Sequence, residues 1–330
     1  MVELNKLVRA DFALQQTFIR VVGAEQSVVQ TTLDACSEIN LVQMHQAIQD
    51  IFRTYSHVYK HDYQKEWQLL DVDMTGAPYG KKAALATKGY FANQRRNRRG
   101  RQIGRVLATT HKEIVVDRLY TGKAQLNNSL GDLVAATAQV LGLEEQQRQR
   151  TIWRIDAGGG SLNDVNSLLA RGYQVHCKDY SAQRTRNLTK SVKEWFRDPL
   201  HGDREVGWVT LESGDYVRPV RRIALRFKKA NGQWGEAVII STLPGEDVQK
   251  LAGETGSEPS NQKASALAYV HFYDQRGGGI ETEFKEDKTG LGLNSRNKKS
   301  FWGQAMVVQL GTLAQNVLIW ARDWLSNGQP

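Results

Sequence analysis

The spacing of hydrophobic residues predicts that the first part of the chain is helical. Between residues 41 and 55, apolar side chains recur every three or four positions, which places them on one face of a helix. These side chains are Leu41, Met44, Ile48, Ile51 and Phe52. The segment 27–36 has similar spacing, and Asn40 is of a residue type that caps helix starts. We therefore expect residues 1–66 to form a helical N-terminal region, with Asn40 as an N-cap.

The next part of the chain, residues 67–200, alternates between strand-like and helix-like patterns. Short apolar segments that end at turn residues predict strands at 67–76, 104–110, 113–119, 151–156 and 173–178. Helical spacing predicts helices at 129–150, from about residue 161, and at 181–196. Three strands followed by helix, strand, helix and strand predict an α/β core.

The pattern changes again near residue 201. The chain then consists of short β-rich segments separated by Gly, Asn and Pro turns, and residues 246–262 have the composition of a loop. From Lys263 to about residue 325, helical spacing returns. We therefore predict a β-rich insertion at 201–257 that interrupts the α/β core, whose second, helical part is residues 258–330.

Composition and charge narrow the class of protein. The chain has 330 residues, 40% of them hydrophobic and 24% charged, which is typical of a folded protein. Its two cysteines, Cys36 and Cys177, exclude a disulfide scaffold and a four-cysteine zinc site, and fit a reducing compartment. No apolar signal segment begins the chain, and polar residues interrupt the apolar stretch 303–321. We expect a cytoplasmic protein with no membrane association, and the net charge of +9 favours a polyanionic partner.

Three acidic residues are candidates for catalysis. Asp73 lies at the end of the first predicted strand and Asp156 at the end of the fourth, where active sites of open α/β sheets gather. Glu281 lies in a later helical segment. Together, three carboxylates would bind one or two hard cations such as Mg²⁺, and two metals stabilise the attacking and leaving oxygens of a phosphodiester displacement. The alternative is that these acids are solvated caps of strands.

The segment 273–288 is rich in polar side chains. Tyr273 and Arg276 share one helical face, and Glu281, Lys285 and Lys288 share another. This combination fits a metal ligand flanked by side chains that contact phosphates. The alternative is an exposed charged helix with internal ion pairs.

The motifs around these residues resemble a known family. They are LLDVDMTG (69–76), TIWRIDAGGGS (151–161) and YDQRGGGIETEFKEDKTGLG (273–292). Over about residues 26–325 the chain resembles bacterial insertion-sequence transposases of the DDE type with a YREK signature. That signature is Tyr, two residues, Arg, three residues, Glu, six residues, Lys.

This chain departs from the family signature by one extra residue between Arg276 and Glu281. Three glycines at 277–279 can absorb it as a bulge or a break in the helix. Glu283 therefore stays an alternative to Glu281, although only Glu281 keeps the gap of six residues to Lys288. Asp71 is likewise an alternative to Asp73, which is favoured because the family's acid precedes a short turn that contains Thr.

The resemblance implies a fold and an activity. The fold is a ribonuclease-H-like mixed α/β sheet flanked by helices, with an inserted β-rich subdomain and a helical N-terminal region. The activity is cleavage at transposon ends and strand transfer into double-stranded target DNA. A two-metal Mg²⁺ site, in which Mn²⁺ can substitute, would be held by Asp73, Asp156 and Glu281.

The resemblance also implies the partners. Tyr273, Arg276, Lys285 and Lys288 would contact the phosphates of the transposon end. The protein would act as a homodimer in a synaptic complex, without a nucleotide cofactor. It would be prokaryotic and associated with the nucleoid when bound to DNA.

A block of arginines precedes the second predicted strand. It contains Arg95, Arg96, Arg98, Arg99 and Arg101, followed by Arg105. Basic side chains so close to the strand that carries Asp73 can bind phosphates without reading sequence. The alternative is a solvated turn between strands.

Two other functions stay open. Only 72 residues precede Asp73, which leaves little room for a domain that recognises transposon ends, so a truncated, catalytically silent DNA-binding relic is the first alternative. The second is a phosphatase of the DxDxT type, because LLDVDMTG resembles its nucleophile motif. However, Asn163 and Asp164 follow Asp156 at a greater distance than in that class, and the segment 273–288 would have no role. The segment 76–82 lacks the spacing of a phosphate-binding loop, which argues against ATP use.

Overall fold

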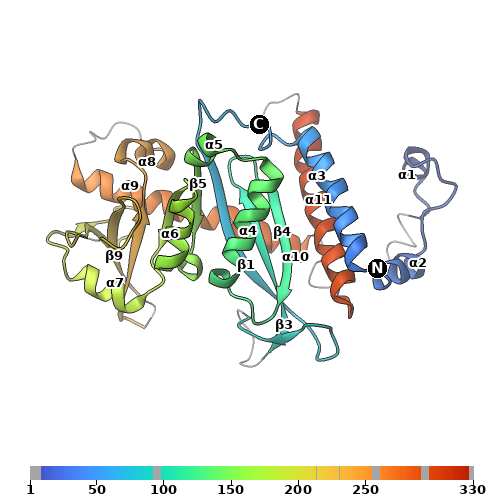
Figure 1. Cartoon of the computed structure of the whole chain (residues 1–330), viewed down its shortest axis with the longest axis horizontal. Helices are drawn as coiled ribbons and strands as arrows, with labels where there is room; N and C mark the ends of the chain where they lie inside the picture. The colour runs from blue at the N-terminus through green and yellow to red at the C-terminus, as the bar shows by residue number, and fades with distance from the viewer. Residues whose placement is uncertain are drawn as a thin grey trace.

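The computed structural model describes residues 9–91, 98–212, 214–229, 231–254, 261–290 and 297–326. Its N-terminal part contains helices α1 (Phe12–Thr17), α2 (Gln26–Asp34) and α3 (Glu38–Tyr55). Helix α3 lies alongside the C-terminal helix α11 (Phe301–Leu325), whereas α1 stands apart from the body of the protein (Figure 1). None of the helices in the described part is long and apolar enough to span a membrane.

Helix α3 begins earlier than the sequence predicts. Its N-cap is Ser37, and Asn40 is the third helical residue of a capping box. The Ser37 backbone N–H donates to Asn40 Oδ1 at 3.0 Å. The prediction that Asn40 is the N-cap is therefore wrong, because a Ser three residues upstream can form the reciprocal pair that caps the helix.

The predicted strands of the core form one side of a large mixed sheet. They are β1 (Gln68–Pro78), β3 (Arg99–Ala108), β4 (Glu113–Thr121), β5 (Thr151–Ile155) and β6 (Gln174–Lys178). Their order in the sheet is β4-β3-β1-β5-β6, and the short strand β2 (Thr87–Lys88) pairs with the start of β3. Strands β1, β5 and β6 are parallel, so their carboxyl ends meet at one edge. Strand β3 runs antiparallel to β1 and β4.

The β-rich segment predicted at 201–257 continues the same sheet. Strand β10 (Trp234–Ser241) pairs antiparallel with β6, and β9 (Arg221–Lys228), β8 (Arg204–Trp208) and β7 (Phe196–Arg197) follow in that order. Part of the loop predicted at 246–262 is instead helix α8 (Gly245–Ala252). That prediction is wrong because the composition hides a short amphipathic helix, which buries Val248 and ends at Gly253 with φ +78°.

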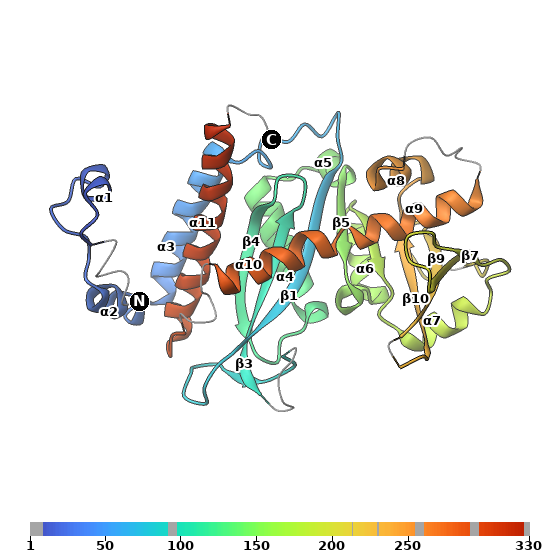
Figure 2. The same ribbon diagram turned by 180° about the vertical axis from the view of Figure 1, so that it is seen from behind.

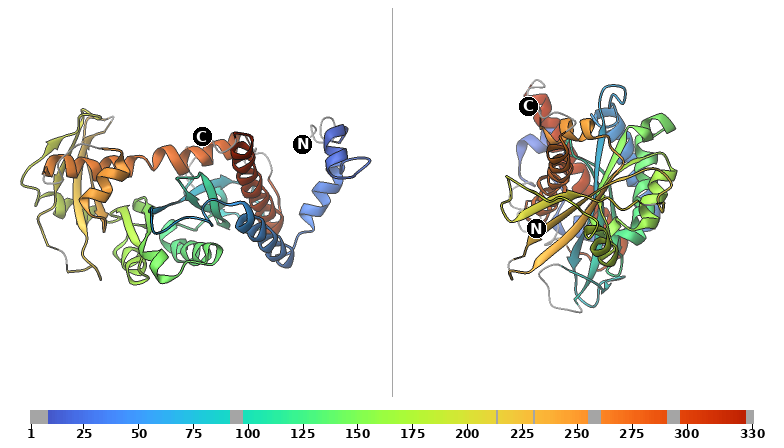
Figure 3. Two further views of the ribbon diagram at one scale, coloured as in Figure 1. Left: turned by 90° about the horizontal axis from the view of Figure 1, so that it is seen from above. Right: turned by 90° about the vertical axis from the view of Figure 1, so that its left-hand side faces the viewer.

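Helices cover both faces of the sheet. One face carries α4 (Leu126–Leu141), α6 (Leu162–Ala170) and α7 (Ala182–Thr189), with α5 (Glu145–Gln149) at one end (Figure 1). Helix α4 ends earlier than predicted because Gly142 adopts a left-handed conformation with φ +62°. Across the opposite face run α9 (Gln262–Asp274), a π-helical turn (Gly277–Glu281) and α10 (Thr282–Thr289), as Figures 2 and 3 show. This mixed sheet flanked by helices confirms the predicted α/β fold class.

The middle of the sheet is packed on both faces. All five residues of β5 are buried, as expected for a parallel strand covered on both faces. Trp153 packs edge-on against Tyr173, with ring centroids 5.8 Å apart. On the other face, α9 buries Tyr269 and Phe272 against the sheet. Side chains of β1 and β5 are therefore held in place by packing on both faces of the sheet.

Candidate active site

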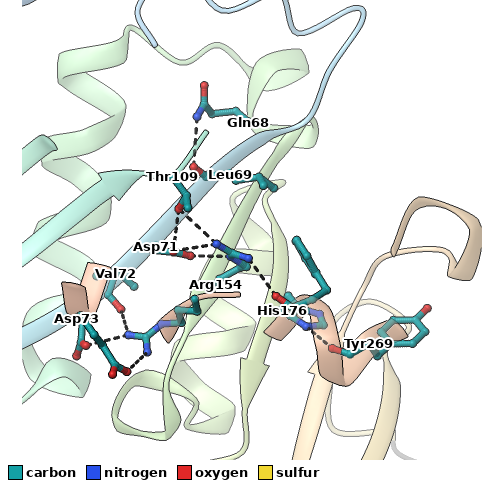
Figure 4. Close-up of polar contacts among 12 residues, drawn as sticks. Gln68, Leu69, Asp71, Val72, Asp73, Thr109, Arg154, His176 and Tyr269 are labelled. Atoms are coloured by element: carbon teal, nitrogen blue, oxygen red, sulfur yellow. Dashed lines mark hydrogen bonds and ion pairs between the residues drawn. The ribbon is translucent and has the colours of Figure 1, made fainter. Parts of the chain in front are cut away.

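Three polar residues in register form a buried row across the parallel strands. Asp71 of β1 is the register partner of Arg154 of β5, which is the partner of His176 of β6. Arg154 Nε and Nη2 donate to the two oxygens of Asp71 at 2.7 and 2.9 Å, and Arg154 Nη1 donates to the Phe272 carbonyl of α9 at 3.0 Å (Figure 4). Thr109 Oγ1 also donates to Asp71, at 2.7 Å. We call Asp71, Arg154 and His176 the inner row.

The inner row is structural. Asp71 and His176 are fully buried. Burial, with a smaller contribution from Arg154, lowers the pKa of His176 to about 3, so the imidazole is neutral near pH 7. His176 Nε2 lies 3.0 Å from the Tyr269 carbonyl of α9. These contacts join the sheet to α9, and they leave Asp71 no open side.

A second row lies two residues further along the same strands. Val72, Ile155 and Cys177 are register partners, so Asp73, Asp156 and Lys178 follow them. Asp156 directly follows β5 and Lys178 is the last residue of β6, whereas β1 continues past Asp73 to Pro78. The prediction that Asp73 ends its strand is therefore wrong, because β1 goes on pairing with β3 after its parallel pairing with β5 stops at Val72. Side chains alternate along a strand, so this row shares the face of the inner row, the one that α9 crosses. We call these three residues the outer row.

Asp73 is partly accessible and carries an unusual pKa. Its side chain is 18% exposed. The Met74 backbone N–H donates to Asp73 Oδ1 at 2.7 Å, and Arg276 Nη2 lies 3.1 Å from Oδ2. The pKa of Asp73 is raised to about 6, chiefly by burial and to a smaller extent by the negative charge of Asp156, while Arg276 opposes both effects. The two aspartates therefore lie close enough to repel each other.

The glycine turn after β5 positions Asp156. Asp156 is the N-cap of a short 3₁₀ helix (Ala157–Gly159), and its Oδ1 accepts from the Gly158 backbone N–H at 2.8 Å. A Cβ on Gly160 would lie 1.7 Å from the Lys178 carbonyl oxygen. Only glycine allows this close approach, which places the turn against the end of β6 and brings Asp156 beside Lys178.

Arg276 connects the covering helix, by which we mean α9, the π-helical turn and α10 (residues 262–289), to the acids. Its side chain is 4% exposed, and Nη2 donates to the Val72 carbonyl at 2.8 Å in addition to its contact with Asp73. Arg276 Nη1 lies 3.7 Å from Glu281 Oε1. Asp73 and its neighbours raise the pKa of Arg276, which keeps the guanidinium charged despite burial. One buried cation thus contacts two of the three predicted metal ligands.

The π-helical turn distinguishes Glu281 from Glu283. A π turn adds one residue to a helix that otherwise continues, as predicted for the glycine run. Beyond it, the side chain of Glu281 is 62% exposed and faces Arg276. Glu283 is buried and accepts from Gln315 Nε2 at 2.7 Å, on the side of α11. The geometry favours Glu281, which agrees with the spacing argument, and likewise favours Asp73 over the enclosed Asp71.

The other residues of the signature lie around the acids. Tyr273 is buried, and its ring centroid lies 4.5 Å from Lys178 Nζ. Lys288 Nζ donates to Thr75 Oγ1, two residues beyond Asp73 on β1. Burial lowers the pKa of Lys288, and Asp73 opposes that shift. Lys285 is exposed on α10.

The predicted arginine block is divided by the fold. Arg95 and Arg96 lie outside the described residues, and Arg98 and Arg99 are exposed. Arg101 is fully buried, and its guanidinium donates to the carbonyls of Ala84, Lys298 and Lys299. The prediction that Arg101 contacts DNA is therefore corrected, because this side chain binds the protein's own backbone.

The acid pair has the donor chemistry of a Mg²⁺ site. Among the described residues, no group of three His, Cys, Asp or Glu side chains is spaced to hold a metal ion. Asp73 and Asp156 nevertheless offer hard oxygen ligands on neighbouring strands, and a divalent cation would favour the charged form of Asp73, which burial and the charge of Asp156 disfavour. Glu281 becomes a third ligand if its carboxylate leaves Arg276.

Two residues of the site are absent from the sequence-based predictions. Arg154 and Lys178 lie on strands whose ends were predicted, but their roles depend on the register between strands. The signal for Lys178 is its place at the end of the fifth predicted strand, the same position that singles out Asp73 and Asp156 on theirs.

Comparisons with known proteins support the fold. Neither a protein-family model nor a curated protein matches this sequence. Among solved structures, the chain is similar to a piggyBac transposase determined by cryo-electron microscopy as a synaptic complex with hairpin DNA. The TM-score is 0.52 at 12% sequence identity, and the match covers 86% of this chain and 56% of the piggyBac transposase chain. The chain therefore has a transposase-like fold and spans little more than half the length of that protein.

Proposed function

We propose that this protein is a DDE-type DNA transposase that cleaves phosphodiester bonds at the ends of a mobile element and transfers the strands to target DNA. The observation that carries the proposal is the placement of Asp73 and Asp156 on neighbouring strands, each one residue beyond the last parallel pair of β1 and β5, within a transposase-like fold. The covering helix supplies Glu281, and Arg276 contacts both Glu281 and Asp73. The spacing of Tyr273, Arg276, Glu281 and Lys288 supports the finer assignment to insertion-sequence enzymes with a YREK signature.

In this proposal, Asp73, Asp156 and Glu281 hold Mg²⁺, which Mn²⁺ can replace. Two bound metal ions would stabilise negative charge on the attacking and leaving oxygens of the phosphodiester. The acids bind the ions, and the packed strands β1 and β5 fix the direction of two of the carboxylates. Partial burial of Asp73 excludes water from one side of the site, which strengthens its electrostatic interactions.

Arg276 and Lys288 would position the phosphates of the DNA end. Arg276 has a planar fork that matches two phosphate oxygens, and it lies between Asp73 and Glu281. When the acids bind metal ions, its guanidinium is free to turn to a phosphate. Lys288 reaches the same edge from α10, beside Thr75. Lys285, Arg98 and Arg99 are exposed and would contact the DNA backbone further out.

The partners follow from the same proposal. The protein would bind double-stranded DNA at both element ends and at the target, as a homodimer in the synaptic complex. It would use no nucleotide cofactor and would act on DNA in the prokaryotic nucleoid.

The test is nicking of a supercoiled plasmid that carries the coding region with its flanking DNA, by the purified full chain in Mg²⁺. We expect nicks at the element ends from the wild type, and none from Asp73→Asn or Asp156→Asn. Glu286→Gln is the matched control, since Glu286 is an exposed acid on the same helix segment as Glu281. DNA binding without nicking by the wild type would instead favour the silent DNA-binding relic, and no binding at all would reject both.

A further inference from the structure

A cavity with a basic lining lies beside the outer row. Its volume is about 500 Å³, within the range in which proteins hold ligands of small-molecule size. It is lined by Lys178, His201, Gly202, Asp203, Arg204, Leu225, Phe227 and Lys228. These residues come from the end of β6, the loop before β8, and strands β8 and β9. The cavity therefore joins the candidate active site to the β-rich part of the sheet.

Lys178 belongs to both features. It is the third member of the outer row, next to Asp156, and it lines the cavity. Its Nζ lies over the ring of Tyr273, 4.5 Å from the centroid, so a side chain of the covering helix directs it. A strand of DNA whose scissile phosphate lies at Asp73 and Asp156 would meet Lys178 as it continues towards the cavity.

The basic side chains of the cavity differ in whether the protein's own carboxylates already pair with them. Arg204 is held by Asp198, with Arg204 Nε 2.7 Å from Asp198 Oδ2, and by Asp274, with Nη1 2.6 Å from Oδ2. Its charge is therefore largely neutralised within the protein. Within the described part of the chain, neither Lys178 nor Lys228 forms an ion pair with a carboxylate, and their cation–π contacts leave the ammonium groups able to bind an anion.

Lys228 stands on the other side of the cavity. Its backbone N–H donates to the Asp203 carbonyl at 3.1 Å, which fixes the rim, and its side chain is exposed. Asp203 is the one acidic residue among the lining residues named above, and it lies beside Arg204 in sequence. Two lysines that form no ion pair with a described carboxylate, on a concave surface, make an electrostatic site for backbone phosphates.

We propose that Lys178 and Lys228 form a phosphate-binding site for the DNA strand on the side of the acid pair that faces the β-rich part of the sheet. The proposal rests on the proposed function, which supplies DNA as the ligand. Lys178 binds the phosphate next to the scissile one, and Lys228 binds a phosphate further along the same strand. The site holds the backbone and reads no sequence.

The first experiment measures binding of a fluorescein-labelled DNA duplex with a single-stranded 3′ overhang to the full chain in EDTA, by fluorescence anisotropy over a salt series. Each phosphate contact adds about 0.7 to 0.9 to the slope of log Kd against log salt concentration. We expect Lys178→Gln and Lys228→Gln each to reduce the slope by about that amount, with additive effects in the double variant. Lys178→Arg should restore the wild-type slope.

Lys65→Gln is the matched control, because Lys65 is a highly exposed lysine at the opposite edge of the sheet, before β1. It should leave the slope unchanged. A wild type that binds this DNA while both Lys178→Gln and Lys228→Gln keep its slope would overturn the inference and leave the proposed function intact. A wild type that fails to bind DNA would overturn both.

The second experiment needs no variant and so does not depend on the folding of one. The wild type is acetylated with and without the same DNA, and each lysine is quantified by mass spectrometry. DNA should protect Lys178 and Lys228 several-fold and should leave Lys65 unprotected. Equal reactivity of Lys178 and Lys228 in both samples, under conditions where the DNA is bound, would reject the site.

Discussion

Arg276 Nη2 lies 3.1 Å from Asp73 Oδ2, and the same nitrogen donates to the Val72 carbonyl at 2.8 Å. Arg276, which follows α9, thus contacts both the backbone and a carboxylate of β1. Without metal ions, the Arg276 guanidinium offsets the negative charge of Asp73, which burial disfavours. The position of the Asp73 carboxylate therefore depends on the position of Arg276.

We expect Arg276→Lys to lose more activity than Lys288→Arg. Arg276 contacts Val72, Asp73 and Glu281 at once through a planar fork, and a lysine ammonium cannot reproduce that geometry. The nicking rate should fall on the order of tenfold or more in Arg276→Lys, as for the loss of a charged hydrogen bond. Lys288→Arg should stay within a few-fold of the wild type. Equal rates in the two variants would show that only the charge of Arg276 matters.

The raised pKa of Asp73 predicts a dependence of stability on pH. The folded pKa of about 6 lies above the ordinary value of 3.8, so the folded state binds this proton more tightly than the unfolded state. The associated stability is present below pH 3.8 and is lost as the pH rises through about 6. Relative to Asp73→Asn, the wild type should lose about 3 kcal/mol of unfolding free energy over this range.

Urea unfolding of both proteins at several pH values measures this difference. Adding Mg²⁺ above pH 6 should stabilise the wild type and leave Asp73→Asn unchanged, because only the wild type keeps the ligand. A difference in unfolding free energy that stays constant with pH would mean that Asp73 titrates normally.

Asp71→Asn should lower the stability of the fold. Asp71 is fully buried and balances the charge of Arg154 through two hydrogen bonds. Removing one partner of such a pair leaves a buried charge and costs about 3–5 kcal/mol. Thermal unfolding should show a large fall in Tm, whereas Thr109→Val, which removes one hydrogen bond to Asp71, should cost about 1 kcal/mol. An unchanged Tm in Asp71→Asn would place Asp71 outside the structural network.

The glycines of the π-helical turn should differ in their tolerance of a side chain. A Cβ on Gly277 or Gly278 would meet open space, whereas one on Gly279 would lie 3.2 Å from both Asp71 Oδ2 and Thr109 Cγ2. Alanine at 277 or 278 should therefore keep or raise stability, by up to about 1 kcal/mol. Gly279→Ala should lower it, as urea unfolding would show.

Deletion of Gly278 should inactivate the protein. Loss of one residue would convert the π turn into α-helix and rotate Glu281 by roughly 100° relative to Arg276. Nicking and stabilisation by Mg²⁺ should both be lost, while Gly278→Ala keeps both. A fully active deletion variant would remove the spacing argument for Glu281 over Glu283.

The arginine block should separate into two classes. Arg98 and Arg99 are exposed, so Arg98→Gln and Arg99→Gln should each lower the slope of log Kd for DNA against log salt by about 0.9 and leave Tm unchanged. Arg101→Gln should instead lower Tm, because it removes hydrogen bonds to Ala84, Lys298 and Lys299. A salt slope that the exposed arginines do not change would mean that they form only a solvated turn.

Local patterns were sufficient to predict the elements that support the candidate site. The apolar residues before Asp73 and Asp156 form strands that are buried in the sheet, which explains why that pattern is needed, although β1 runs on to Pro78. The extra residue before Glu281 falls in a glycine run, and the π turn absorbs it there. The N-cap of α3 and the helix α8 were missed, because capping depends on reciprocal side-chain contacts and a short helix can have the composition of a loop.

Only the tertiary structure decided which charged residues are enclosed and which are available. Asp71 and Asp73 differ by two positions and point to the same face, yet Arg154, from a strand far along the chain, encloses only the first. Arg99 and Arg101 are equally basic, yet Arg99 is exposed and Arg101 is buried, where it donates to the carbonyls of Lys298 and Lys299. The sequence determined the main strands, most of the helices and the candidate acids, because these follow from local periodicity. The register between strands placed Lys178 beside Asp156, and register depends on contacts between residues that are distant in sequence.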